Sequence, residues 1–159
     1  MLRTKVDTTL VIHACPEGSI PLVEGILKQK LNWLEQELLK GTSRSQIQLK
    51  LTELETDELM SELHGVPGLH LDLIQTGKEH GVIFMLCPGF GIYRAETNLA
   101  GEILLSEDRI WGIVQASNGN QRELQRLLRL ALGQNWDDLL EPFRAQRLNS
   151  NVVLLNQAG

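Results

Sequence analysis

The sequence predicts one α+β domain that covers residues 1–159 and is built on a mixed, mainly antiparallel sheet. The expected order is a ferredoxin-like βαββαβ start, then a hairpin, a C-terminal helical cluster and a last strand. Two observations support this class. Stretches of alternating or β-branched apolar residues recur between turn residues, which is typical of strands. The segment Asn120–Arg144 carries the longest helical pattern, with caps and an apolar face that agree.

The bulk composition indicates a globular protein without a membrane or nucleic-acid partner. Of 159 residues, 42% are hydrophobic and 22% are charged, as in an ordinary globular domain. No apolar run approaches the ~20 residues of a membrane span, and the apolar patch near the N-terminus, about five residues long, is too short for a signal peptide. A net charge of −5 disfavours non-specific nucleic-acid binding. We therefore expect a cytoplasmic protein.

The N-terminal half should alternate strands and helices. Thr8–His13 is rich in β-branched residues and predicts the first strand. Ser19 then caps a helix with Pro21 in its first turn and Val23 in its buried stripe. Asn32–Leu38 fits either a second strand or a continuation of that helix, and we favour the strand.

The next elements complete the ferredoxin-like order. Gln46–Thr52 alternates strictly between apolar and polar residues, which predicts a half-buried strand. Thr56 is expected to cap a short helix over Asp57–His64. Leu69–Leu73 alternates again and is the last strand of this unit, and Val82–Leu86 is a continuous apolar strand beyond it.

A hairpin and a helix should follow. Its two strands are expected at Gly91–Thr97 and Glu102–Leu105. Ser106 caps the helix after them. The apolar residues of this helix should point inward, namely Ile110, Trp111, Ile113 and Val114.

Two C-terminal helices should then cover the sheet. Asn120 caps the first, and Gly133 supplies its left-handed stop. Asn135 caps the second, which should end or kink at Pro142 because proline lacks an N–H. Val152–Leu155 is the expected last strand. The side chains expected to seal the sheet are Leu124, Leu128, Leu139 and Phe143.

One face of the first C-terminal helix predicts a partner-binding surface. Arg122, Arg126 and Arg129 lie opposite its leucines and could bind an acidic protein or a small anionic ligand. The alternative is a solvated face whose arginines pair with Asp137 and Asp138.

A carboxylate on an apolar helix face is the best candidate for an acid–base site. Glu24 falls within the apolar stripe of its helix, so it should be partly desolvated and should seek a cation or a hydrogen-bond donor. Its expected partners are His13 and either Arg94 or Arg109. Such a cluster could be catalytic, or it could be a structural ion pair. Tyr93 and Arg94 lie on opposite faces of their strand, so only one of them can join it.

The cysteines, histidines and glycines match no metal or cofactor motif. Cys15 precedes a helix N-terminus and has His13 nearby, so it could be reactive, although free cysteines are usually buried apolar groups. Two cysteines are too few for a disulfide framework, and no pair of ligands shows the short spacing of a zinc site. Gly89-Phe90-Gly91 leads into a strand rather than a helix, unlike a phosphate loop. We expect no cofactor and no metal.

Two segments carry a family resemblance. One is Gly91–Arg109, GIYRAETNLAGEILLSEDR, and the other is Leu128–Arg144, LRLALGQNWDDLLEPFR. Both are similar to a bacterial family known only as domain of unknown function 3145. Weaker similarities at His13 and in the closing valines extend the resemblance over nearly the whole chain. It implies a cytosolic protein with a compact shared fold and no assigned activity. Cys15 and Gly25 depart from the family pattern, which weakens the case for a reactive cysteine.

The favoured functional interpretation is a non-catalytic module that binds a protein or a small ligand, because no catalytic motif is present. The alternative is an enzyme with an unrecognised acid–base site near Glu24, His13 and Arg94. Both interpretations stay open on the sequence alone.

Overall fold

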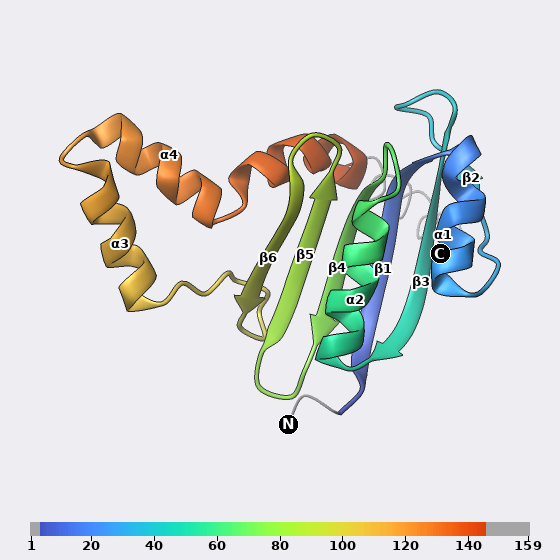
Figure 1. The fold of residues 1–159 in the computed structure, drawn as a ribbon, viewed down its shortest axis with the longest axis horizontal. Coiled ribbons are helices and arrows are strands. Elements are labelled where there is room, and N and C mark those ends of the chain that lie inside the picture. Colours follow the sequence, from blue (N-terminus) through green and yellow to red (C-terminus); the bar gives the residue numbers. More distant parts are fainter. Residues whose placement is uncertain (1–3, 146–159) are drawn as a thin grey trace, which may run out of the picture.

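The computed structural model describes residues 4–145 and shows an α+β fold (Figure 1). The strands are β1 (Val6–Pro16), β2 (Leu34–Glu35), β3 (Thr42–Leu51), β4 (His70–Thr76), β5 (Gly81–Cys87) and β6 (Gly91–Thr97). The helices are α1 (Ile20–Leu27), α2 (Glu53–His64), α3 (Glu107–Ser117) and α4 (Gln121–Ala131), with a 3-10 turn, η1 (Glu17–Ser19), before α1. A further helix covers residues 134–145. The predicted strand Val152–Leu155 lies outside the described residues.

All six strands form one antiparallel sheet in the order β2-β3-β1-β4-β5-β6. The predicted order of strand, helix, strand, strand, helix, strand is present in the first half. In the unit β3-α2-β4, strand β1 lies between the two strands that α2 connects. Within Asn32–Leu38 only Leu34–Glu35 pairs as a strand, against β3, so this predicted strand is confirmed in a much shorter form.

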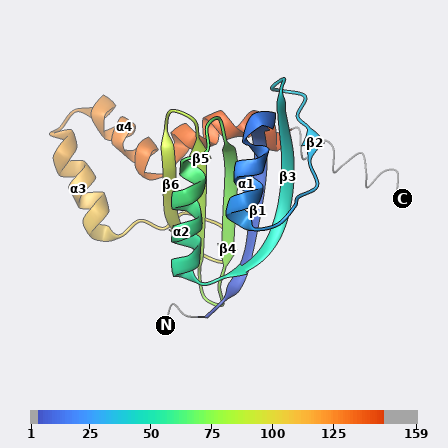
Figure 2. The same ribbon diagram turned by 45° about the vertical axis from the view of Figure 1, so that its right-hand side comes forward.

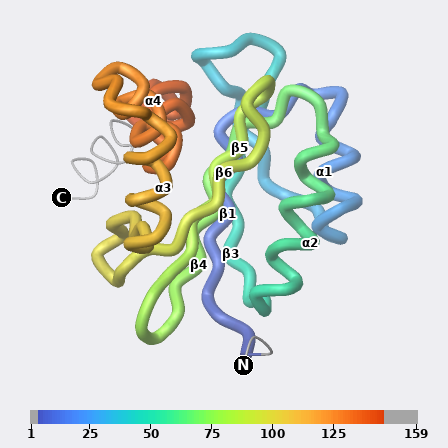
Figure 3. Tube along the Cα trace, turned by 60° about the vertical axis from the view of Figure 1, so that its left-hand side comes forward, coloured from blue at the N-terminus to red at the C-terminus, as the bar shows by residue number. Residues whose placement is uncertain are grey.

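Helices α1 and α2 lie together on one side of the sheet, as Figures 2 and 3 show. Apolar side chains at alternate positions of the central strands fill the space beneath them, with Leu10, Ile12, Leu71 and Leu73 almost fully buried. Val23 of α1 and Leu63 of α2 complete this main core. Burial of these side chains supplies the principal stabilisation of the fold.

A smaller core lies on the other face of the sheet, beneath helix 134–145. It joins Leu140 of that helix to Met85, Tyr93 and Ala95 of β5 and β6. The expectation that both C-terminal helices seal the sheet is wrong. Leu140 is fully buried but Leu139 is 42% exposed, and α4 packs mainly against α3 in a hairpin that projects beyond β6 (Figure 1).

Three helix details differ from the predictions. Helix α2 begins one turn early, because Thr52 and Glu55 form a reciprocal capping box while Thr56 is buried. In α3, Trp111 is 58% exposed rather than turned inward, because the helix packs on α4 and not on the sheet. The last helix begins at residue 134, so Asn135 lies inside it and is not its cap, and within the described residues it continues past Pro142 to residue 145. No helix within residues 4–145 is long and apolar enough to cross a membrane.

Candidate functional site

A groove between the sheet edge and the α3–α4 hairpin is the best candidate for a functional site. It has a volume of about 440 Å³ and opens beside β6, the last strand of the sheet. Its apolar walls come from the strand, the hairpin and the last helix, through Ile92, Ile113, Leu127, Leu130 and Trp136. Because α3 and α4 stand away from the sheet, these walls stay partly open to solvent.

The segment between β6 and α3 holds one end of the groove. Strand pairing nearly stops after β6, where the predicted strand Glu102–Leu105 is reduced to a single bridge between Thr97 and Ile103. The Asn98 side chain accepts hydrogen bonds from the backbone N–H groups of Ala100 and Glu102, which closes a tight turn and brings the chain back beside the end of β6. The chain then leaves the sheet before α3 begins (Figure 1).

The junction at Gly133 holds the other end. Gly133 has a φ of +72°, a left-handed conformation that ends α4. Its backbone also lies close to the ring of Tyr93, so a Cβ added at this position would be 2.8 Å from Tyr93 Cε2. Tyr93 Oη donates a hydrogen bond of 2.6 Å to the carbonyl of Ala131, and Trp136 Nε1 donates one of 3.1 Å to the carbonyl of Gly91. These contacts fix the direction in which α4 leaves the sheet.

Two arginines are the charged residues in the lining of the groove. Arg94 projects from β6 toward α2, where it pairs with Glu53 at 3.0 Å and Asp57 at 3.8 Å. Arg109 lies exposed in the first part of α3, and within the described residues no carboxylate forms an ion pair with it. Arg109 is therefore the positive charge that this groove offers on its apolar walls, because the charge of Arg94 is paired on the α2 face of the sheet.

A buried polar cluster ties helix 134–145 to the sheet on the same face as Tyr93. Asp72 of β4 accepts a hydrogen bond of 2.8 Å from His13 Nε2 and two more, of 2.9 and 2.7 Å, from the guanidinium of Arg144. Arg144 also donates to Asp137 at 2.8 Å. Phe143 covers the cluster, with its ring 6.0 Å from that of His13. A planar guanidinium that binds a carboxylate through two donors makes a strong, directional contact.

The same cluster perturbs its ionisable groups. Burial alone would raise the pKa of Asp72, but the hydrogen bonds from His13 and Arg144 outweigh it and hold the pKa below its usual value. Despite its own burial, Arg144 has a raised pKa because it pairs with Asp72 and Asp137. Asp72 and Arg144 therefore stay charged and paired across the neutral range, which indicates an anchor for the helix.

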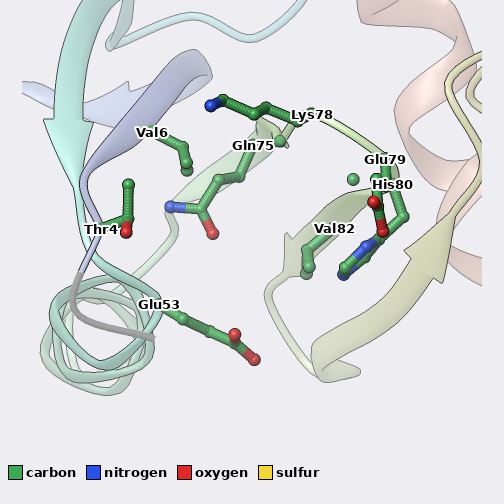
Figure 4. Close-up of a pocket in the computed structure, with 10 residues that line it drawn as sticks. Thr4, Val6, Glu53, Gln75, Lys78, Glu79, His80 and Val82 are labelled. Carbon is green, nitrogen blue, oxygen red and sulfur yellow. The ribbon is translucent and has the colours of Figure 1, made fainter. Parts of the chain in front are cut away.

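A second hollow, of about 610 Å³, lies at the end of the sheet near the turn between β4 and β5 (Figure 4). Its polar residues do not converge. In Figure 4 the amine of Lys78 points away from both the Glu53 carboxylate and the His80 ring. The amide of Gln75 donates to Thr8 and Thr56. This hollow therefore lacks a preorganised set of reactive groups.

The structure does not bring Glu24, His13 and Arg94 together, so the expected cluster is wrong. The Glu24 carboxylate accepts hydrogen bonds from the Leu31 N–H at 2.8 Å and from Trp33 Nε1 at 3.2 Å. The Leu31 and Trp33 hydrogen bonds lower the pKa of Glu24 and fix the chain that leaves α1. The periodicity of the sequence predicts the helix that carries Glu24. It does not predict that donors in the following loop, at Leu31 and Trp33, form hydrogen bonds with the carboxylate.

The arginine stripe of α4 is largely paired within the chain. Arg126 pairs with Glu123, and Arg129 pairs with Asp138 at 2.6 Å, as the solvated-face interpretation predicted for Asp138. Asp137 instead pairs with Arg144. The role of Arg122, Arg126 and Arg129 in binding a partner stays a prediction.

The cysteines lie in unreactive surroundings. Burial raises the pKa of Cys15 to about 11, and burial with the neighbouring charge of Asp72 raises that of Cys87 to about 11. A thiol of this pKa holds almost no thiolate at neutral pH. Within residues 4–145 no cluster of three or more His, Cys, Asp or Glu side chains could hold a metal ion.

Sequence reasoning missed the groove, although it identified several of its residues. Tyr93 and Arg94 do lie on opposite faces of β6, as predicted, since Tyr93 bonds to Ala131 and Arg94 to Glu53. The amphipathic pattern of α4 was the available signal, but it was assigned to the sheet rather than to an open wall.

Comparisons with known proteins give a family and no function. No curated protein and no solved structure matches the chain. The family model described as "Protein of unknown function (DUF3145)" matches residues 9–157, which include both segments that carried the resemblance. The chain therefore belongs to this family of proteins of unknown function.

Proposed function

We propose that the chain is a non-catalytic binding module that holds a segment of a partner protein in the groove between β6 and the α3–α4 hairpin. The observation that carries this proposal is the groove itself, an apolar hollow of about 440 Å³ kept open by a hairpin that does not pack on the sheet. Ligand sites of proteins typically have volumes of about 300–1,000 Å³ and mostly apolar linings with a few polar groups.

The chemistry of the lining favours binding over catalysis. A general acid or base must exchange a proton near neutral pH. Beyond its arginines, the titratable group in this groove is Tyr93, whose pKa is raised by burial and whose hydroxyl already bonds to Ala131. Arg109, which is exposed and has no ion-pair partner within the described residues, instead suits the recognition of a carboxylate.

Selection from a peptide library tests this proposal. Random peptides of about 12 residues are displayed and selected on the purified protein. The enriched peptides are then synthesised, and their affinities are measured by fluorescence anisotropy. We expect them to combine apolar and acidic residues.

Three variants locate the binding surface. Arg109→Glu reverses an exposed charge of the groove and Ile113→Lys places a charge on its wall. Each should weaken binding at least about tenfold, which corresponds to about 1.4 kcal/mol. The matched control is Leu54→Lys, at a leucine that is 63% exposed on α2 outside the groove, and it should bind as the original protein does. Circular dichroism checks that each variant folds. If Ile113→Lys fails to fold, Arg109→Glu still tests the groove, because Arg109 is exposed.

Two results would overturn the proposal. One is that no peptide is enriched above the level on an unrelated protein. The other is that peptides bind the groove variants normally but lose affinity when Arg122, Arg126 and Arg129 are all replaced by alanine, which would move the binding surface to the stripe on α4.

A further inference from the structure

We infer that the bound segment is an extended strand of another protein, with apolar residues and an acidic residue, that adds to the free edge of β6. This inference rests on the proposed binding function and specifies how the groove would be used. Addition of a strand to an exposed sheet edge is a recurrent mode of peptide recognition, in which the main chain gives affinity and alternate side chains give specificity.

The hydrogen bonds after β6 show which backbone groups face the groove. The carbonyl of Glu96 accepts a hydrogen bond of 2.9 Å from the N–H of Leu104, on the side of β6 away from β5. Backbone groups of successive strand residues point to alternate edges, so those of Arg94 and Ile92 also point outward. In the part of the chain that the structure describes, no donor or acceptor pairs with these outward groups of Ile92 and Arg94. They form a short unpaired edge along the groove.

The groove walls match the side chains of such a strand. A strand beside Ile92 and Arg94 projects its side chains alternately to opposite faces. Apolar side chains on one face can pack against Leu127, Leu130 and Trp136. An acidic side chain of the segment can approach Arg109, which has no ion-pair partner within the described residues, whereas the Arg94 guanidinium is paired with Glu53 and Asp57. The charge of the occupant thus follows from the charge of its site.

A second copy of this chain does not fit the same edge. Edge-to-edge pairing of two β6 strands requires the sheet of the second copy to continue beyond β6. Figures 1 and 2 show the α3–α4 hairpin standing in that direction, so the hairpin of each copy would meet the sheet of the other. A single extended segment is the occupant that the groove admits.

A proline substitution isolates the backbone contribution. Arg94→Pro removes the outward N–H of this residue but leaves the pairing of β6 with β5 intact, because proline is tolerated on an edge strand when its nitrogen faces outward. Arg94→Ala is the matched control, since it removes the same side chain and keeps the N–H. With peptides selected on the original protein, we expect Arg94→Pro to bind about three- to tenfold more weakly than Arg94→Ala, as for one lost hydrogen bond.

N-methylation of the peptide gives the same test without altering the protein. Each backbone N–H of a bound peptide is replaced in turn by N-methyl. Strand addition predicts that affinity falls at every second position, because only alternate N–H groups of an edge strand face its partner. This measurement decides the question if Arg94→Pro does not fold.

The outcomes separate the two proposals. Peptides that lose affinity with Arg109→Glu, but show no alternating N-methyl pattern and bind Arg94→Pro and Arg94→Ala equally, overturn strand addition and leave the binding module in place. Failure to select any groove-dependent peptide overturns both. A different result would overturn the proposed occupant. If sedimentation shows a stable dimer that Arg94→Pro converts to a monomer, a second copy of the chain pairs with the edge of β6 instead of a partner segment.

Discussion

Replacing Gly133 with alanine tests the junction that directs α4 away from the sheet. The added Cβ would lie 2.7 Å from Met85 Cε and 2.8 Å from Tyr93 Cε2, closer than real Cβ contacts. The backbone is also held at a φ of +72°, where a side chain is strained. Tyr93 would have to move, and its hydrogen bond to Ala131 would be disturbed.

The expected loss of stability has two parts. Adopting the left-handed conformation costs a residue with a Cβ about 1–2 kcal/mol. Overpacking against the Tyr93 ring and the Met85 methyl adds about 1–3 kcal/mol. The free energy of unfolding should therefore fall by about 3 kcal/mol. For a chain of this size the Tm should drop by about 9 °C, at about 2–4 °C for each kcal/mol.

The glycine of the α3–α4 turn provides a matched control. Gly119 has a similar φ of +77°, but no atom lies within 4 Å of the position of its Cβ. Gly119→Ala should therefore lose only the conformational part, about 1–2 kcal/mol. Both variants are compared by urea unfolding followed by circular dichroism. Equal losses in the two variants would refute the close approach of the junction to Tyr93.

Four further predictions concern the rest of the fold. Arg144→Met leaves the charge of the buried Asp72 underpaired, so it should lower the free energy of unfolding by about 3 kcal/mol in urea titrations. The pKa of Asp72 is lower in the folded state, so the stabilisation from its carboxylate is complete above the unfolded pKa of about 3.9 and is lost as the pH falls through the folded pKa. Asp72→Asn should therefore flatten the dependence of the free energy of unfolding on pH below about pH 4. An unchanged pH dependence would contradict this role of Asp72. Cys15 and Cys87 should resist iodoacetamide at pH 7.5 until denaturant is added, and rapid labelling of the native protein would contradict their burial. Thr52→Ala should cost about 1 kcal/mol of thermal stability, whereas no loss would speak against this residue as the cap of α2.

The strands were predictable because their signal is local. Alternating burial is visible along Gln46–Thr52, where the structure has β3, and the continuous apolar run Val82–Leu86 became the buried strand β5. The caps Ser106 and Asn120 were also correct, because each side chain accepts a hydrogen bond within the next turn of backbone.

The C-terminal helices show what a local sequence pattern cannot predict, namely the surface against which a helix packs. An amphipathic helix must bury its apolar face, but the pattern does not say against what. The leucines of α4 face α3 and the groove rather than the sheet, so the predicted seal was assigned to the wrong partner. The start of α2 was misplaced although the sequence carries a local signal for it, because Thr52 has Glu55 three residues later, as a capping box requires, and Thr56 has no such partner.

The buried Asp72 cluster and the groove both depend on contacts between residues that are distant in the sequence. His13 and Asp72 are 59 positions apart, and Asp72 and Arg144 are 72 apart, so no spacing rule could pair them. The free edge of β6 requires knowledge of the strand order, which places this strand last in the sheet. The family resemblance was confirmed over residues 9–157, but it carries no activity that could have indicated a site.

Amide hydrogen exchange of β6, followed by NMR, tests the central claim most directly. The outward amides of Ile92 and Arg94 should exchange rapidly in the free protein, because they form no hydrogen bond within the described residues. Saturation with a selected acidic peptide should slow both at least about tenfold, while the inward amide of Ala95 changes little. Unchanged exchange at Ile92 and Arg94, with new protection on the arginine face of α4, would contradict the account.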